Sequence, residues 1–166
     1  MTRLVRIRLE KRDVSCVARL LEAEAPRTCA AVWDALPQGG DAFHAKYARN
    51  EVYTMVPRFS PDPVGPENTT VTPIPGDVMY FDFAAGVLDR GFRQQIGVDE
   101  LPGAIDLAIF YGRNNLLLSP TQGFVRANVY ATIVENFEAF AAACQDVWRG
   151  GAIGETLTYA RVEGRS

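Results

Sequence analysis

Histidine and cysteine are scarce in this chain of 166 residues, which has one histidine and three cysteines. Protein zinc sites take three or four such ligands or carboxylates, so this supply does not build the usual zinc site. Cys16, Cys29 and Cys144 are widely spaced and lie among apolar neighbours. This pattern is typical of small buried residues in a reducing compartment and not of a disulfide framework. We therefore expect no metal site.

Motifs that bind nucleotides or hold a nucleophile are also missing. The chain has no G-x-x-x-x-G-K-[ST] loop, no G-x-G-x-x-G and no nucleophile elbow. We expect no cofactor, which leaves acid–base chemistry or plain binding of a small molecule.

Basic clusters and long apolar runs are absent as well. Lys and Arg number 17 against 20 Asp and Glu, a formal net charge of −3. Phosphate binding needs gathered positive charge, and the arginines of residues 3–12 do not stay on one strand face, so we expect no nucleic acid partner. No apolar run reaches the ~20 residues that cross a membrane, and no apolar signal core follows the charged N-terminus. We expect a cytoplasmic protein without a membrane partner.

Alternating apolar and polar residues predict strands along most of the chain. The expected strands cover residues 3–9, 14–21, 41–47, 51–56, 76–83, 105–112, 123–134 and 156–163. Between them, residues 57–75 hold six prolines, which exclude a central strand or a long helix and predict an ordered surface excursion or a flap. Residues 90–97 could form one short helical turn.

Two segments follow the helical spacing of apolar residues. Residues 26–36 begin at Pro26, which suits a first helical position, and end at Pro37 and the Gly39-Gly40 pair. Residues 136–149 begin at Asn136 as the expected cap. The expected buried stripes are Cys29, Val32, Trp33 and Leu36 in the first helix, and Phe137, Phe140, Ala141, Cys144, Val147 and Trp148 in the second. The chain is thus predicted to be one domain over residues 1–166, mainly β with two helices, forming a closed β-barrel of about eight strands capped by helices.

Several motifs resemble known proteins. A helix beginning "APRT" (residues 25–28) before a strand with "FHA" (residues 43–45) resembles the start of cyclophilins, where that strand reads Phe-His-Arg. The stretches "PIPGDVMYFDF" (73–83), "IDLAIFYGRN" (105–114) and "NVYATIVENFEAFAAACQDVWR" (128–149) resemble a bacterial group of uncharacterised cyclophilin-like proteins. Cucumopine synthase, an opine-forming enzyme, contains a related domain. The resemblance implies a cyclophilin-like barrel.

The resemblance runs from about Val5 to Arg161, and it departs from the cyclophilins at their active site. Ala45 stands where the cyclophilin catalytic arginine follows Phe-His, and "KYARNEVYTMVP" replaces their glutamine- and glycine-rich stretch. Alanine has no charged donor to polarise a prolyl amide. The resemblance therefore disfavours peptidyl-prolyl isomerase activity.

His44 is the first candidate for chemistry, because its ordinary pKa of about 6.5 suits proton transfer. We expect His44 to move a proton, with Glu51 or Tyr47 orienting it. A tight hairpin would bring Glu51 near Lys46 or Tyr47, and His44 would lie a little deeper. The alternative is a strand histidine that faces water or is satisfied by hydrogen bonds at the barrel rim.

A second candidate lies at the end of an apolar strand. Tyr111 precedes Gly112, and Arg113 and Asn114 then offer donors that could hold a carboxylate. An ordinary turn is the alternative. Tyr80 is a further candidate, and its side chain could face either a cleft or solvent. We expect Arg126 to face outward, into solvent.

Two functions follow as hypotheses. The first is a cofactor-free enzyme or enzyme-like binder for a small carboxylate-bearing metabolite, by analogy with opine synthesis. The second is a non-catalytic interaction module that retains only the barrel. We also expect a homodimer, because five large apolar residues lie on segments with weak secondary-structure patterns. They are Phe59, Val87, Leu88, Phe92 and Ile96.

Overall fold

The computed structural model describes residues 2–84, 87–88, 90–95 and 103–163. Its strands are β1 (Leu4–Leu9), β2 (Val14–Leu20), β3 (Gln38–Asp41), β4 (Phe43–His44), β5 (Glu51–Pro57), β6 (Thr69–Thr70), β7 (Asp77–Ala84), β8 (Gly103–Phe110), β9 (Leu118–Ser119), β10 (Gly123–Phe124), β11 (Ala127–Glu135) and β12 (Thr156–Arg161). Its helices are α1 (Pro26–Ala35), α2 (Arg90–Gln95) and α3 (Phe137–Gly150).

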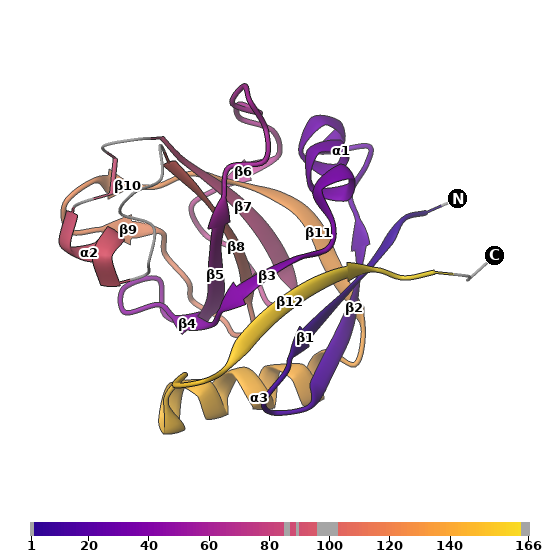
Figure 1. Cartoon of the computed structure of the whole chain (residues 1–166), viewed down its shortest axis with the longest axis vertical. Coiled ribbons are helices and arrows are strands. Elements are labelled where there is room, and N and C mark those ends of the chain that lie inside the picture. Colours follow the sequence, from indigo (N-terminus) through magenta and orange to yellow (C-terminus); the bar gives the residue numbers. More distant parts are fainter. Residues whose placement is uncertain (1, 85–86, 89, 96–102, 164–166) are drawn as a thin grey trace.

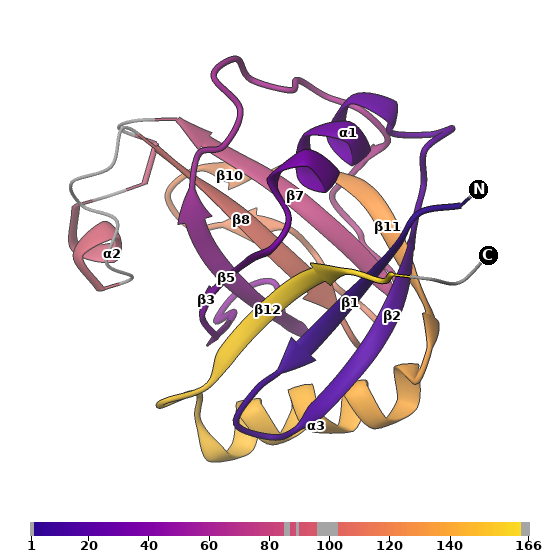
Figure 2. The same cartoon turned by 45° about the vertical axis from the view of Figure 1, so that its right-hand side comes forward.

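Of the described strands, β9 and β10 form a separate two-stranded sheet, and the other ten form one antiparallel sheet that curls into a barrel (Figure 1). Its order is β3-β12-β1-β2-β11-β7-β8-β5-β4, with β6 paired to β11. The two edges meet where β3 passes β5, and a Cβ added at Gly40 would lie 3.0 Å from Thr54 Oγ1. Because β1 pairs with β12, the start of β1 and the end of β12 lie side by side in both ribbon views (Figure 2). The prediction of a mainly β barrel is confirmed.

The sheet is apolar on both faces over β5, β7 and β8. Its inner face lines the barrel with residues such as Ile7, Leu107 and Tyr159. Its outer face carries a second apolar cluster, called here the outer cluster. The outer cluster comprises Tyr53, Met55, Met79, Phe81, Leu88, Ala104, Ala108, Phe110, Leu117, Ala127 and Val129. A strand buried on both sides is therefore rich in apolar residues throughout, as β8 is.

The helices lie where the pattern predicts them. In α1, Pro26 is at the first turn and Cys29 and Val32 are buried. In α3, Cys144 and Val147 are buried, and the helix runs below β2 in Figure 1. The three cysteines are buried and free, as expected. Within the described residues, no helix has the length and apolar character needed to cross a membrane.

Several local predictions for the strands are wrong. Gly39 and Gly40 do not stop a helix but form β3 against β12. The strand expected over residues 41–47 is divided between β3 and β4 and ends at His44. The single apolar face expected along residues 125–133 is also interrupted, because the pairing of β11 with β7 shifts between Val129 and Ala131. That bulge puts Val129 in the outer cluster and Ala131 in the barrel core.

Two predictions for the second helix also need correction. Asn136 occupies the position before α3, but its side chain donates to Ser15 O at 2.7 Å and does not cap the helix. Trp148 is 57% exposed and is not part of the buried stripe.

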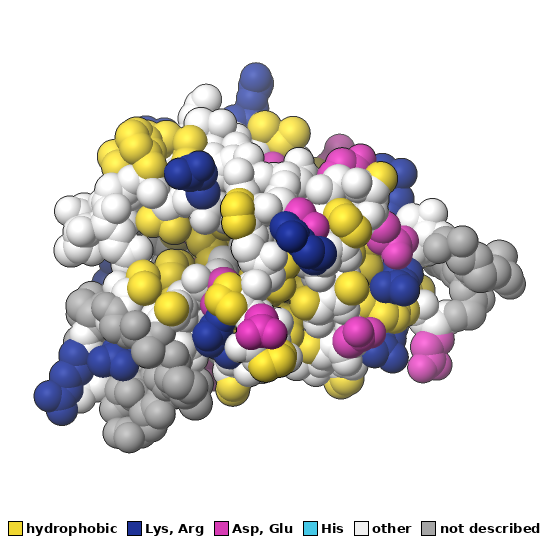
Figure 3. Space-filling model, turned by 90° about the horizontal axis from the view of Figure 1, so that it is seen from above, with side chains coloured by type: hydrophobic (Ala, Val, Ile, Leu, Met, Phe, Trp, Pro, Cys, Tyr) yellow, Lys and Arg dark blue, Asp and Glu magenta, His cyan; other side chains and the backbone are white. Residues whose placement is uncertain are grey.

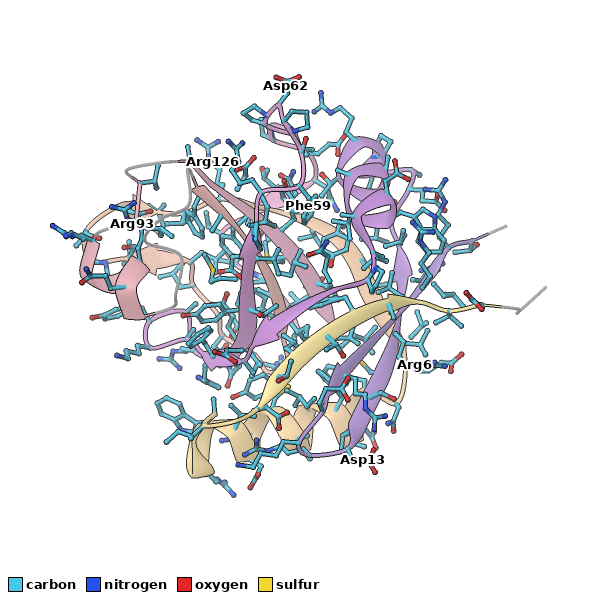
Figure 4. All side chains as sticks on the ribbon, viewed as in Figure 1. Arg6, Asp13, Phe59, Asp62, Arg93 and Arg126 are labelled. Atoms are coloured by element: carbon cyan, nitrogen blue, oxygen red, sulfur yellow. The ribbon has the colours of Figure 1, made fainter. Side chains whose placement is uncertain are left out.

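The apolar residues expected at a dimer interface are partly covered by the chain itself. Leu88 is buried, and Phe59 packs on the core beside Tyr80, with 6.0 Å between ring centroids. Figure 4 shows Phe59 on the barrel side of its loop. Val87 is exposed. Ile96 and the side chain of Phe92 lie outside the described residues.

The excursion over residues 57–75 is anchored by Glu67 at the start of α1. Its carboxylate accepts from the N–H of Arg27 at 3.1 Å and from the N–H and hydroxyl of Thr28, both at 2.8 Å. Burial by itself raises the pKa of Glu67, but these hydrogen bonds from Thr28 and Arg27 hold the pKa below its ordinary value. A loop carboxylate thus caps the helix, which has no side-chain cap from its own Ala25.

We predict that Glu67→Ala lowers the free energy of unfolding by about 1–2 kcal/mol at pH 7, because the first turn of α1 loses its acceptors. Since the folded-state pKa is lowered, the difference from wild type should shrink as the pH falls below the ordinary glutamate value. Urea unfolding at several pH values measures both. Glu24→Ala, at an exposed position just before α1, is the control; an equal effect there would contradict the capping role.

Candidate functional site

A cavity of about 320 Å³ opens on the outer face of the barrel. Its floor comes from β5, β7 and β8, and its walls come from the loop after β4 and from residues 117–125. The lining residues are Ala45, Lys46, Tyr47, Ala48, Glu51, Tyr53, Phe81, Phe83, Leu88, Asp106, Leu117, Leu118, Ser119, Pro120, Thr121, Gln122 and Val125. The volume lies within the range of small-molecule sites.

Two carboxyl groups lie in this mostly apolar cavity. Glu51 begins β5 and is 5% exposed, and Asp106 lies in the middle of β8 and is 6% exposed. Strand pairing places Glu51 opposite Phe110 and Asp106 opposite Met55, so both carboxyls belong to the outer face. On β5, Tyr53 lies between Glu51 and Met55 on the same outer face.

Burial changes the protonation of both groups. It raises the pKa of Glu51 to about 8. Burial, together with the nearby charge of Glu51, raises the pKa of Asp106 well above its ordinary value. Burial and the same two carboxyls also raise the pKa of Tyr53. A carboxyl that titrates near neutral pH can both give and take a proton.

One oxygen of Asp106 also lacks a hydrogen-bond donor within the described residues. Its Oδ1 is buried, and no donor reaches it from the residues that the structure describes. A buried polar atom is normally paired, because leaving it unpaired costs about 1–3 kcal/mol. Such a cost is expected for a residue that is retained for binding and not for stability.

His44 lies on the other side of the sheet. It pairs with Val52, whose side chain is in the barrel core, whereas Glu51 faces outward. Its Nε2 is 2.6 Å from the Tyr111 hydroxyl, and its Nδ1 is 2.9 Å from Ala45 O. The carbonyl requires Nδ1 to donate, so Nε2 accepts from Tyr111.

The surroundings of His44 favour its neutral form. Its ring packs on Trp148 with 4.8 Å between centroids. Burial lowers its pKa, although the bond to Ala45 O acts in the opposite direction. Both ring nitrogens are occupied, so the expected orientation by Glu51 or Tyr47 is not found. The structure agrees instead with a histidine satisfied at the barrel rim.

The other predicted residues do not converge on the cavity. Arg113 and Asn114 are exposed, and neither they nor Tyr111 line it. Tyr80 lies in the barrel core at 2% exposed. Of the predicted residues, Glu51 and Tyr47 line the cavity together, and Tyr47 is 66% exposed at its mouth.

The turn that carries Arg113 is organised by its neighbour Asn115. This buried side chain donates to Pro73 O at 3.0 Å and to Gly112 O at 2.7 Å, and it accepts from Asn50 N at 3.2 Å. Asn114 adopts a left-handed conformation with φ 63°. The segment therefore has the contacts of a structural turn.

Comparison with known proteins places the chain in a family. A family model described as a protein of unknown function, DUF3830, matches residues 7–159. The chain belongs to the DUF3830 family. No curated protein sequence matches it.

Two solved structures are similar to the DUF3830 chain. McbB, solved in complex with tryptophan, has a TM-score of 0.65 and 15% sequence identity over 98% of the chain. The chain spans 46% of the length of McbB. The hypothetical protein AF2241 from Archaeoglobus fulgidus has a TM-score of 0.46 and 21% identity, with 97% of the chain and 95% of AF2241 covered. The expectation of an uncharacterised family with a cyclophilin-like fold is confirmed, and no comparison tests the link to cucumopine synthase.

Asp106 is the residue of the candidate site that sequence reasoning missed. It is the only charged residue in the otherwise apolar stretch Gly103–Phe110. Charged residues are seldom fully buried unless they are paired, so a lone acid in a strand that is apolar on both sides was the available signal. Within the described part of the DUF3830 chain, no three His, Cys, Asp or Glu side chains gather as a metal site would require.

Proposed function

We propose that the protein is a small-molecule enzyme, or an enzyme-like binder, that transfers protons in the cavity on the outer face of the barrel. The observation that carries the proposal is the pair of buried carboxyls, Glu51 and Asp106, in an apolar cavity. Two carboxyls held near each other in low polarity do not ionise together, so one can act as the acid while the other is the base.

The roles differ because the two carboxyls differ in position. Glu51 begins its strand beside the loop that carries Tyr47, near the mouth of the cavity. Its pKa of about 8 suits proton exchange with a ligand near neutral pH. Asp106 lies at mid-strand, and its unpaired Oδ1 suits the holding of a ligand donor.

The comparison with McbB adds modest support. McbB was solved in complex with tryptophan, which is a small molecule with an aromatic ring, an amine and a carboxylate. A cavity lined by Tyr53, Phe81 and Phe83 is suited to an aromatic body of that size. The earlier idea of a carboxylate held by Arg113 finds no support in the cavity lining.

We predict that a ligand panel of amino acids, amines, small keto acids and cyclic amides contains a class that raises the melting temperature. A ligand at about 100 times its Kd stabilises the folded state by about 2.7 kcal/mol. For a chain of this size the shift is roughly 5–10 °C. Thermal-shift measurement and calorimetry test this result.

Two variants locate the effect. Ala48→Trp, which fills the cavity wall, should abolish the shift, and His44→Ala, outside the cavity, should retain it. If no class stabilises the wild type, or if Ala48→Trp binds as the wild type does, the proposed site is wrong.

The second candidate function is a non-catalytic interaction module. Ala45 favours the interaction module. This residue lines the cavity, and it stands at the sequence position where the resemblance to cyclophilins places their catalytic arginine. The same alanine disfavours prolyl isomerase activity. A ligand that reacts, and not merely binds, in the wild type but not in Glu51→Gln would exclude the module.

We also propose a homodimer, which now rests on a different and smaller set of exposed apolar residues. Val87, Leu118 and Phe124 are 45%, 44% and 65% exposed near the cavity mouth. In Figure 3 apolar side chains gather toward the left of the face shown, while acidic and basic ones are interspersed. We predict a dimer mass by light scattering at micromolar concentration, and Phe124→Glu should yield monomers. A monomer mass for the wild type would end the proposal.

A further inference from the structure

We infer that the cavity selects a protonated amine carried on an aromatic or apolar body, with Asp106 as the anion that holds the nitrogen. This inference rests on the proposed function, because it names the ligand class for the same cavity. It goes further by excluding the carboxylate-bearing class that the sequence suggested.

A buried oxygen of Asp106 lacks a hydrogen-bond donor among the described residues. Its side chain is more than nine-tenths buried, lines the cavity, and has no donor for Oδ1 within the described residues. The donor that satisfies a buried carboxylate best is charged, since charge-assisted hydrogen bonds are roughly twice as strong as neutral ones. An ammonium group from the ligand supplies both the hydrogen bond and the opposite charge.

The charged side chains around the cavity favour a cationic ligand over an anionic one. The described lining brings carboxyls from β5 (Glu51) and β8 (Asp106) and phenols from Tyr47 and Tyr53, while β7 brings only Phe81 and Phe83. Residues 117–125 contribute no charged group to the lining. Lys46 is the cation of this lining, and it is exposed.

The aromatic side chains of the cavity favour a ligand with an aromatic or apolar body. Tyr53, Phe81 and Phe83 offer aromatic faces, which attract cations and stack on other rings. An anionic ligand would instead meet two carboxyls in a place of low polarity. Arg113, the candidate partner for an anion, is exposed and outside the lining.

The linkage of binding to protons gives the inference a distinct readout. An amine that remains charged pairs with the ionised carboxyls, so it displaces the protons that burial retains on them. Its affinity should therefore rise as the pH increases from 6 to 8, by up to about tenfold per unit for each proton released. A carboxylate ligand should show the opposite trend.

Isothermal calorimetry with two matched pairs of probes tests the inference. The pairs are tryptamine with indole-3-propionate, and 2-phenylethylamine with 3-phenylpropionate, so that only the charged end changes within a pair. The wild type should bind each amine at least tenfold more tightly than its matched acid at pH 8. Titrations in buffers of different ionisation enthalpy should show proton release when the amine binds.

Asp106→Asn should weaken amine binding at least tenfold while keeping the shape of the side chain. Asp77→Asn is the matched control, since burial raises the pKa of Asp77 too, yet this residue does not line the cavity. If Asp106→Asn fails to fold, the pH trend and proton release of the wild type decide the matter.

The outcomes distinguish a wrong ligand class from a wrong ligand site. If the acids bind as tightly as the amines and Ala48→Trp abolishes their binding, the cavity remains the ligand site and the choice of an amine is wrong. Unchanged tryptamine affinity in Asp106→Asn also overturns the inference. If neither pair binds, the inference is wrong, and the wider ligand panel decides independently whether the cavity is a site.

Discussion

Glu51→Gln should be more stable than the wild type at pH 8 and nearly equal to it at pH 5. Burial raises the pKa of Glu51 to about 8, so the folded state retains a proton that the unfolded chain releases near pH 4.5. The folded state then binds more protons over this window, and stability falls as the pH rises. Glutamine keeps the size of the side chain and removes the titration. The expected gain at pH 8 is on the order of 2–3 kcal/mol.

Urea unfolding of both proteins at half-unit steps from pH 5 to pH 8.5 measures this difference. His44 also titrates in the protein, and the comparison at each pH removes its contribution from the difference. Burial and the charge of Glu51 both raise the pKa of Asp106, so the difference reports the coupled titration of the two carboxyls. Asp62→Asn is the control, because Figure 4 shows Asp62 at the exposed tip of its loop. A constant difference between wild type and Glu51→Gln across this range would mean that Glu51 is ionised in the folded state.

The same variant would reveal the cost of the site. A strand residue chosen for stability alone would not be a carboxyl at 5% exposure. If Glu51→Gln gains stability and loses its reaction or ligand, Glu51 is retained for chemistry and not for the fold.

Glu155→Ala should lower the free energy of unfolding by about 3–5 kcal/mol, because it breaks a buried ion pair. Glu155 is 1% exposed. Its Oε1 accepts from Lys11 N at 2.8 Å and from Thr156 N at 3.0 Å, and its Oε2 accepts from Arg12 Nη1 at 2.9 Å. Alanine leaves these donors unpaired at the junction of the β1–β2 turn with the start of β12.

A melting-temperature drop of roughly 10 °C is expected, measured by calorimetry at pH 7. Asp146→Ala provides the matched control, because Asp146 binds the same Arg12 at 2.8 Å but is 67% exposed. Exposed ion pairs contribute about 0–1 kcal/mol, so its effect should be small. Equal losses in the two variants would show that Arg12, and not the buried carboxylate, carries the stability.

The sequence predicts the barrel well because burial on two faces leaves a strong pattern. Strands β1, β5 and β8 and helix α1 are found within a residue or two of their expected bounds. The bulge in β11 was not predictable from alternation, because no glycine or proline stands between Val129 and Ala131 to signal it.

The candidate site was harder to predict from the sequence, because the face that a residue occupies depends on the strand register. His44 draws attention as the only histidine, but which face of the sheet it occupies depends on how β4 pairs with β5 across residues 45–50. A change of one residue in that pairing would exchange the positions of His44 and its neighbours. Asp106 could have been found without knowing the strand register, because a single acidic residue between apolar neighbours is informative on either face of the sheet.

The pairing of β1 with β12 also affects how the chain can be reconnected. Val5 lies opposite Arg161, and Val162 N donates to Leu4 O at 3.0 Å, so the pairing closes a loop of nearly the whole chain. A circular permutant that joins these strands by a short linker and opens the chain at Asp62 would turn that contact into a local hairpin. The sheet would keep its order while its contact order falls, and two-state proteins with lower contact order fold faster. Opening the chain at Asp62 would place β5 far along the chain from its partner β8, so the slowest step in assembling this barrel would then be the pairing of β5 with β8.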